Sequence, residues 1–173
     1  AFDLLHRVLK SNGFEVVFAI NFTDIDDKII KKMKEEGKSL EEITTFYIKN
    51  YKNDMEILNI LPNSFEPKAT ENLDAMKEMI ENLLSKDIAY KTDDSVYFDV
   101  SKDSFYGTLS NQASDDNSIA RVEINKEKRN SSDFALWKFE KASDVSYISS
   151  FGKGRPGWHI ECSAMIEKHL AYK

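Results

Sequence analysis

"FEVVFAINFTDIDDK", residues 14–28, joins a run of apolar and β-branched side chains to a cluster of acidic ones. Its first part, Phe14–Phe22, is almost continuously apolar, which is typical of a parallel strand that is buried on both faces. Thr23 and Asp24 follow, where ligands of open α/β sheets bind, beyond the carboxyl end of a strand. The stretch therefore predicts an α/β fold in which a buried strand leads into a helix.

Thr23 and Asp24 have two interpretations. Either side chain can cap the helix that follows, and Asp26 and Asp27 suit the positive end of its dipole. Alternatively, the hydroxyl and the carboxylate orient a polar substrate or its ammonium group. Local chemistry leaves both interpretations open.

Helical periodicity surrounds this stretch. The opening, residues 1–13, carries apolar side chains at helical spacing and stops at Asn12-Gly13. Gly37 ends the next helix, and "SLEE", residues 39–42, is a capping box for a third. Another helix is expected after Pro67. Its apolar stripe consists of Leu73, Met76, Ile80 and Leu83.

The period changes to two after residue 86. "AYKTDDSVYFDV", residues 89–100, alternates around a turn at Asp93-Asp94 and predicts a β-hairpin. Residues 101–133 are polar, with "ARVEIN", residues 120–125, as one further candidate strand. "DFALWKF" then returns aromatic side chains to a core. We interpret residues 86–150 as a small β-containing insertion.

The composition narrows the class of protein. The chain has 173 residues, a formal net charge of −6 and one cysteine. The charge argues against a surface coated in positive charge for generic nucleic-acid binding. The single cysteine suits a reducing compartment, and no apolar run approaches the roughly 20 residues that span a bilayer. We therefore expect a cytoplasmic protein without a membrane segment.

Two basic runs have a structural and a functional interpretation. Lys28, Lys31, Lys32 and Lys34 lie on one expected helix, and "KEKR", residues 126–129, lies in a polar loop. A solvated charged surface is the default explanation for both. Contact with RNA phosphates is the alternative.

"GKGRPGWHIEC", residues 152–162, ends on the only cysteine of the chain. Pro156 and Gly157 predict a turn, and a helix is expected to start near Trp158. On that helix, Trp158 and Cys162 are one turn apart and share a face. A helix N-terminus with Lys153 and Arg155 nearby favours the thiolate form of the cysteine.

Three roles are open to Cys162 from these residues. It is a small buried hydrophobe beside a core tryptophan, a nucleophile paired with His159, or a zinc ligand. The nucleophile lacks an obvious orienting acid and oxyanion hole. Zinc needs about four ligands, and His159, Glu161 and His169 do not convincingly complete a set. If Cys162 binds zinc, its partners lie outside this chain.

Two stretches in this order and at this separation, "NFTDIDDK" and "GRPGWHIECSAM", resemble cysteinyl-tRNA synthetases. "ILPNSFEPKATENL", "SFYGTLSNQ" and "KRNSSDFALWK" are similar to the same family, and the resemblance covers essentially the whole chain. It implies an α/β fold: a partial, Rossmann-like class I synthetase catalytic domain interrupted by a small connective insertion. Residues 1–85 and 151–173 would belong to the catalytic domain, and residues 86–150 to the insertion.

The resemblance also implies a reaction and a site. Cysteine and ATP, with Mg²⁺, would form cysteinyl-adenylate, and the cysteinyl group would pass to the cognate tRNA. Cys162 matches a ligand of a zinc ion that binds the substrate thiolate. Trp158 matches a tryptophan that lines this pocket, and Thr23 matches a threonine close to the substrate. Zinc–thiolate bonding would reject serine, which shape alone separates poorly from cysteine.

The family's HIGH and KMSKS motifs and its other zinc ligands are absent from this sequence. We therefore expect an internal fragment that is inactive alone and whose catalytic residues are not in this chain. Two alternatives are a fragment of the related ligase that joins cysteine to an amino sugar in mycothiol synthesis, and a noncatalytic α/β binding module. Oligomeric state is not indicated by the sequence.

Overall fold

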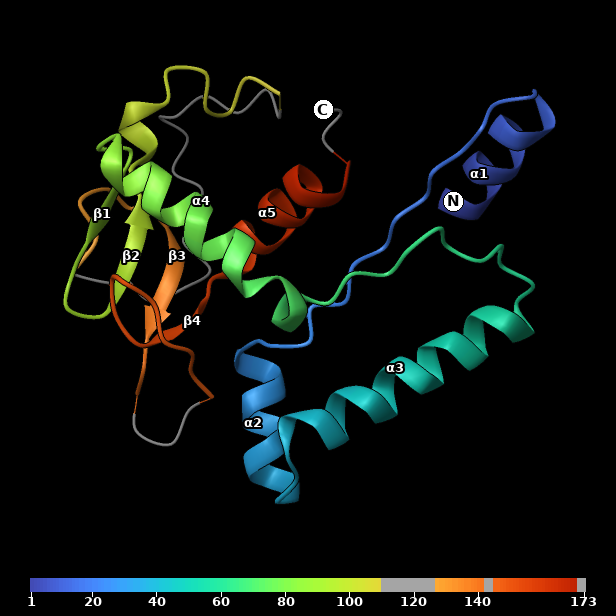
Figure 1. Ribbon diagram of the computed structural model, residues 1–173, viewed down its shortest axis with the longest axis horizontal. Helices are drawn as coiled ribbons and strands as arrows, with labels where there is room; N and C mark the ends of the chain where they lie inside the picture. Colours follow the sequence, from blue (N-terminus) through green and yellow to red (C-terminus); the bar gives the residue numbers. More distant parts are fainter. Residues whose placement is uncertain (110–126, 142–144, 171–173) are drawn as a thin grey trace. The chain divides into compact units, whose positions relative to one another are not determined.

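The computed structural model describes residues 1–109, 127–141 and 145–170. The chain divides into two compact units, Ala1–Asn72 and Leu73–Lys173 (Figure 1). Each unit buries apolar side chains of its own.

Glycines close the first two helices of the first unit. α1 (Phe2–Ser11) ends before Gly13, which has a φ of 84°. α2 (Asp27–Glu36) ends at Gly37, which has a left-handed φ of 63°. Both stops are at the residues that the sequence indicates, because glycine adopts this conformation without a Cβ clash.

α3 (Leu40–Ile57) begins with the expected capping box. The Glu42 backbone N–H donates to Ser39 Oγ at 3.2 Å, and the Ser39 backbone N–H donates to Glu42 Oε2 at 2.8 Å. α3 packs against α2, and Ile30 and Ile43 are buried. Two backbone N–H groups at the start of α3 are therefore satisfied by side chains only three residues away, so this cap depends on local sequence.

The expected cap of α2 by Thr23 or Asp24 is wrong. Asp26 is the cap, and its carboxylate accepts a hydrogen bond from the Ile29 backbone N–H at 2.7 Å. Asp24 instead accepts hydrogen bonds from the backbone N–H and the hydroxyl of Thr70, at 2.9 and 2.5 Å. Asp24 is therefore engaged by a residue far along the chain, and the nearer Asp26 caps the helix.

The expected buried parallel strand over Phe14–Phe22 is also wrong for the described residues. The segment is extended, but only two isolated parallel bridges join it to residues 65–68. Phe14 and Val17 are 63% and 60% exposed. A strand that is buried on both faces needs neighbouring strands and covering helices. Among the described residues this segment has one parallel neighbour over a short length.

The second unit contains a four-stranded sheet in the order β1-β2-β3-β4, with every neighbouring pair antiparallel. The strands are β1 (Ala89–Lys91), β2 (Ser95–Phe98), β3 (Phe134–Phe139) and β4 (Gly154–Pro156). The expected hairpin is confirmed, with Tyr90 opposite Tyr97. This sheet is not the parallel Rossmann-like sheet that the resemblance implies, and such a sheet is not seen among the described residues.

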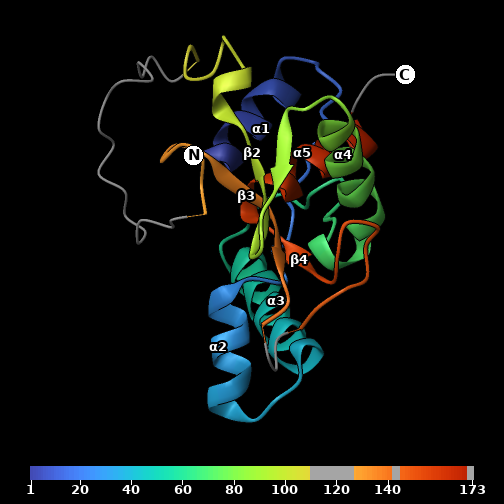
Figure 2. The same cartoon turned by 90° about the vertical axis from the view of Figure 1, so that its left-hand side faces the viewer.

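Two helices cover one face of this sheet (Figure 2). They are α4 (Leu73–Ser85), which follows the short 3₁₀ turn η1 (Ala69–Asn72), and α5 (Trp158–Leu170). The expected apolar stripe of α4 supplies Met76 and Ile80, both fully buried, and the sheet supplies Trp137. Burying a side chain of this kind contributes about 1.5–3 kcal/mol, so the second unit closes a substantial core.

The boundaries of the connective insertion, residues 86–150, stay a prediction. β4 lies beyond residue 150 and pairs with β3, so residues on both sides of that boundary share one sheet. The candidate strand at residues 120–125 lies outside the described residues.

Candidate substrate and metal site

The glycines before α5 allow an unusually close approach of β4 to β3. A Cβ on Gly154 would lie 2.2 Å from the Lys138 carbonyl oxygen, and one on Gly157 would lie 1.9 Å from the Ala135 carbonyl oxygen. The Gly157 backbone N–H donates to the Leu136 carbonyl at 2.8 Å. These contacts attach the start of α5 to the sheet.

The expected turn at Pro156-Gly157 is therefore wrong, because Pro156 ends a strand. Gly154 is the one glycine within β4, and an isolated glycine in a strand marks a close backbone approach. Gly154 is the signal that could have identified β4. The identity of its neighbour, β3, depends on residues far away in the sequence.

α5 separates an inner face from an outer face. Ile160, Ala164 and Met165 are buried, whereas Trp158 is 69% exposed and Cys162 is exposed. Trp158 and Cys162 thus share the outer side of α5, as their spacing predicts. The interpretation of Cys162 as a buried hydrophobe beside a core tryptophan is wrong.

The electrostatic surroundings of Cys162 oppose the thiolate. Partial burial and the neighbouring negative charge of Glu161 raise the pKa of the Cys162 thiol. The expectation that nearby Lys153 and Arg155 favour the thiolate is therefore wrong in direction. Lys153 Nζ pairs with Glu140 at 2.9 Å. A ligand that requires the thiolate must displace this proton.

His159 stands beside Cys162 in sequence but packs into an aromatic row. Its ring centroid is 4.7 Å from that of Phe134 and 5.5 Å from that of Trp158. Partial burial lowers the pKa of His159, which favours the neutral imidazole over the charged form. Nothing in these contacts assigns it the role of a general base.

Cys162 suits zinc in one respect, because an exposed sulfur is a soft donor. Within residues 1–109, 127–141 and 145–170, no group of three or more histidine, cysteine, aspartate or glutamate side chains is arranged to hold a metal ion. The residues present fit one zinc ligand and not a complete zinc site.

Thr23 lies in the first unit, half-buried, and lines a pocket of about 320 Å³. The pocket is mainly apolar, with Phe22, Tyr47 and Tyr51 in its wall and Asp24 as a polar neighbour. Its size falls within the range of about 300–1,000 Å³ that is usual for small-molecule sites. Thr23 therefore stands at the edge of a cavity that can admit a small ligand.

Both basic runs contain a cation over an aromatic ring, and in the first run Lys32 Nζ lies 5.5 Å from the centre of the Tyr47 ring. Lys31 and Lys32 on α2 pair with Glu35 and Glu36 one turn later, at 3.7 and 2.9 Å, as on a solvated helix face. In the second run, Lys126 lies outside the described residues. Lys128 and Arg129 are described, and both lie over aromatic rings.

Comparison with known proteins extends over the whole chain. The family model described as the tRNA synthetases class I (C) catalytic domain matches residues 1–173. A cysteine–tRNA ligase of Aliarcobacter butzleri is 74% identical over 173 residues, which are 100% of this chain and 37% of that protein.

Two further relatives agree with this match. Cysteine–tRNA ligases of Nitratiruptor sp. and Sulfurovum sp. are 60% and 57% identical, over 99% and 98% of this chain. The chain spans 37% of the length of each of these relatives. No helix in the described part of the chain is long and apolar enough to cross a membrane. The chain belongs to the family of class I (C) tRNA synthetase catalytic domains.

Proposed function

We propose that this chain is an internal part of a cysteine–tRNA ligase. The observation that carries the proposal is the 74% identity to a cysteine–tRNA ligase over all 173 residues. The complete protein would join cysteine to ATP, with release of pyrophosphate, and pass the cysteinyl group to the terminal ribose of its tRNA. Mg²⁺ would accompany ATP as part of that substrate.

The outer face of α5 supports a role in choosing the amino acid. Trp158 and Cys162 stand one turn apart on this face, and neither is needed to fill the core. Exposed aromatic and thiol side chains contribute little to core packing and are accessible to a ligand. We assign Trp158 to the wall of the cysteine pocket and Cys162 to its metal.

Thr23 is proposed as the residue of the first unit that contacts the substrate. It borders the pocket of about 320 Å³, and its hydroxyl is 3.5 Å from Asn21 Nδ2. A hydroxyl at the edge of a mainly apolar cavity can orient a small polar ligand.

Zinc would supply the distinction between cysteine and serine. A substrate thiolate bonds zinc as a soft ligand, whereas the serine hydroxyl is harder and remains protonated. Cys162 would hold the ion together with residues that this chain does not supply. The raised pKa of the Cys162 thiol predicts that zinc binding releases a proton and weakens as pH falls.

The proposed reaction predicts where the protein acts. Activation of cysteine requires ATP and a reduced substrate thiol, so we expect the protein in the cytoplasm, where thiols stay reduced. The chain by itself is expected to be inactive, because the residues that bind ATP in this family are not in its sequence.

The test is cysteine-dependent exchange of pyrophosphate into ATP by the full-length protein, followed by transfer of labelled cysteine. Exchange with cysteine and transfer to tRNA are expected. Exchange with another amino acid alone would contradict the assignment of cysteine. Transfer to an amino sugar in place of tRNA would contradict the assignment of the acceptor.

A further inference from the structure

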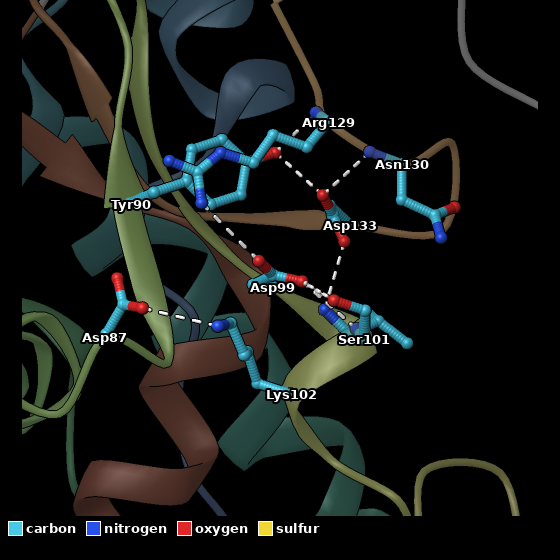
Figure 3. Close-up of polar contacts among 9 residues, drawn as sticks. Asp87, Tyr90, Asp99, Ser101, Lys102, Arg129, Asn130 and Asp133 are labelled. Atoms are coloured by element: carbon cyan, nitrogen blue, oxygen red, sulfur yellow. Dashed lines mark hydrogen bonds and ion pairs between the residues drawn. The ribbon is translucent and has the colours of Figure 1, made fainter.

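Two buried carboxylates lie beneath the second basic run. Asp133 is 1% exposed and accepts three hydrogen bonds, from Tyr90 Oη at 2.7 Å and from the backbone N–H groups of Val100 and Asn130 at 3.0 Å each (Figure 3). The bonds tie the chain after residue 126 to the hairpin. A buried carboxylate with this many donors is held in one orientation.

Asp99 is the second carboxylate, and it is 6% exposed. It caps the 3₁₀ turn η2 (Val100–Lys102) and accepts hydrogen bonds from the backbone N–H and hydroxyl of Ser101, at 3.1 and 2.5 Å. The hydroxyl bond from Ser101, together with the weaker effect of its backbone N–H, lowers the pKa of Asp99 below its usual value, although burial acts in the opposite direction. Asp99 is therefore a fixed negative charge inside the unit.

Arg129 is positioned by both parts of this network. Its backbone N–H donates to Tyr90 Oη at 2.8 Å, and its guanidinium carbon lies 4.1 Å from the centre of the Tyr90 ring. Its Nη1 is 3.6 Å from Asp99 Oδ2. The guanidinium is thus held against an aromatic face on one side and a buried charge on another, as Figure 3 shows.

This arrangement differs from that of an arginine whose only role is structural. A bidentate arginine–carboxylate pair has N–O distances of about 2.7–2.9 Å, whereas the Arg129–Asp99 contact is 3.6 Å. The Arg129 side chain is also 58% exposed. Arginine carries five N–H donors in a planar fork, and a single long ion pair leaves most of that fork for another acceptor.

Lys128, the preceding residue in the chain, provides a second cation over an aromatic ring. Its Nζ lies 5.9 Å from the centre of the Tyr97 ring, and the rings of Tyr97 and Tyr90 are 5.8 Å apart. Neighbouring rings therefore carry neighbouring cations on the hairpin. The negative charges of Asp99 and Asp133 are buried, and the positive charge of Arg129 faces solvent.

We propose that Lys128 and Arg129 form a phosphate-binding site for the backbone of the tRNA substrate. The proposal rests on the proposed function, because it takes its ligand from that reaction. Two adjacent cations match successive phosphates of one RNA strand, and the arginine fork matches phosphate oxygens. The net charge of the chain is −6, so a local cationic site of fixed geometry is a better explanation than a general basic surface.

The experiment measures tRNA affinity of the full-length protein at several salt concentrations. The variants are Arg129→Gln and Lys128→Gln. The matched control is Lys77→Gln on α4, which removes the same charge from a lysine that pairs with Asp74 at 3.2 Å. Removing one phosphate contact is expected to lower the magnitude of the slope of log K against log salt by about one. The control is expected to retain the slope of the unsubstituted protein.

Equal slopes for Arg129→Gln, Lys128→Gln and the control would overturn the proposal. A raised KM for ATP with an unchanged tRNA slope would also overturn it, by assigning the site to nucleotide phosphates. Lys128→Gln leaves the Asp133 network intact and carries the test if Arg129→Gln does not fold. Pyrophosphate exchange by the unsubstituted protein tests the proposed function separately, so the two failures are distinguishable.

Discussion

Met76 and Trp137 in the second unit are fully buried, whereas Phe2, Phe14 and Val17 in the first unit are between 60% and 72% exposed. Met76 lies on α4 and Trp137 on β3, where two helices cover one face of the sheet. The exposed side chains lie on α1 and on an extended segment with one parallel neighbour. Apolar sequence is similar in both places, so the difference comes from the layers available to cover it.

This contrast separates two sources of stability. The second unit is expected to depend on packing, and the first on helix caps and on hydrogen bonds such as those between Asp24 and Thr70. Substitutions that remove buried volume should therefore act mainly on the second unit. Segment-resolved hydrogen exchange in denaturant gives the local free energy of opening in each unit.

The largest expected difference in stability is between variants of the two tryptophans, Trp137 and Trp158. Trp137→Ala removes a fully buried ring and is expected to lower the opening free energy of the second unit by about 3–5 kcal/mol. Trp158→Ala removes a ring that is 69% exposed and should change it by less than about 0.5 kcal/mol. In the full-length protein, Trp158→Ala should nevertheless raise the KM for cysteine. Similar losses of stability in both variants would place Trp158 in the core.

The cost of replacing a glycine by alanine is also expected to differ between the two units. Gly157→Ala would place a Cβ 1.9 Å from the Ala135 carbonyl oxygen, so β4 must move from β3 at a cost of about 3 kcal/mol or more. Gly13→Ala meets no atom within 4 Å and has only its φ of 84° to oppose it, which costs about 1–2 kcal/mol. The measurement is loss of amide protection, in β3 and β4 for Gly157→Ala and in α1 for Gly13→Ala. A smaller loss for Gly157→Ala than for Gly13→Ala would contradict the close approach of the two strands.

Buried carboxylates offer a third comparison. Asp133→Asn disturbs three hydrogen bonds and is expected to cost about 3 kcal/mol, because bonds to a charged acceptor are strong. Asp24→Asn disturbs two bonds to Thr70 and should cost about 1.5 kcal/mol. Denaturation midpoints of both variants, followed by exchange in each unit, provide the check. A larger loss of stability for Asp24→Asn than for Asp133→Asn would mean that the first unit depends more on its buried carboxylate than the second unit does.

The smallest effects on stability are expected from changes in pH. Tyr90 contributes at the alkaline end of the pH range and Glu36 at the acidic end. Burial and the Asp133 carboxylate raise the pKa of Tyr90 to about 12, from 10.0, against the lowering effect of the Arg129 backbone N–H. The folded state therefore binds the phenol proton more tightly, and this contribution is complete below pH 10.0 and is lost as pH rises toward 12. Lys38 and Lys32 lower the pKa of Glu36 to about 2, from 4.5, so its contribution to the first unit is lost as pH falls through that interval.

Tyr90→Phe and Glu36→Gln separate the two contributions. Exchange profiles against pH should lose the alkaline component in the first variant and the acidic component in the second. An unchanged alkaline profile in Tyr90→Phe would contradict the buried bond to Asp133.

Local signals were sufficient for part of this fold. The capping box at Ser39 and Glu42, the stop at Gly37 and the hairpin around Asp93-Asp94 each depend on residues close in sequence. The prediction of a strand at Phe14–Phe22 failed because burial requires neighbours that periodicity does not reveal. The prediction of a cap at Asp24 failed because Thr70, far along the chain, engages that carboxylate.

In the candidate site too, some features could be predicted from nearby residues and others could not. The shared face of Trp158 and Cys162 follows from their spacing on a helix, and it is confirmed. The direction of the Cys162 pKa was predicted wrongly because it depends on burial and on Glu161, which is 1% exposed. Arg129 gave no signal beyond its charge, since its position depends on Tyr90 and Asp99, more than 25 residues earlier in the chain.

The proposed role of Cys162 is to hold a zinc ion that selects cysteine over serine. The measurement is kcat/KM for pyrophosphate exchange with cysteine relative to serine, in the full-length protein and in Cys162→Ser, with Ser163→Ala on the same helix as the control. We expect Cys162→Ser to lose at least about 100-fold of the preference for cysteine, since a hydroxyl is a poorer zinc ligand and shape separates serine weakly. The control should keep the preference. An unchanged preference in Cys162→Ser would contradict this proposed role.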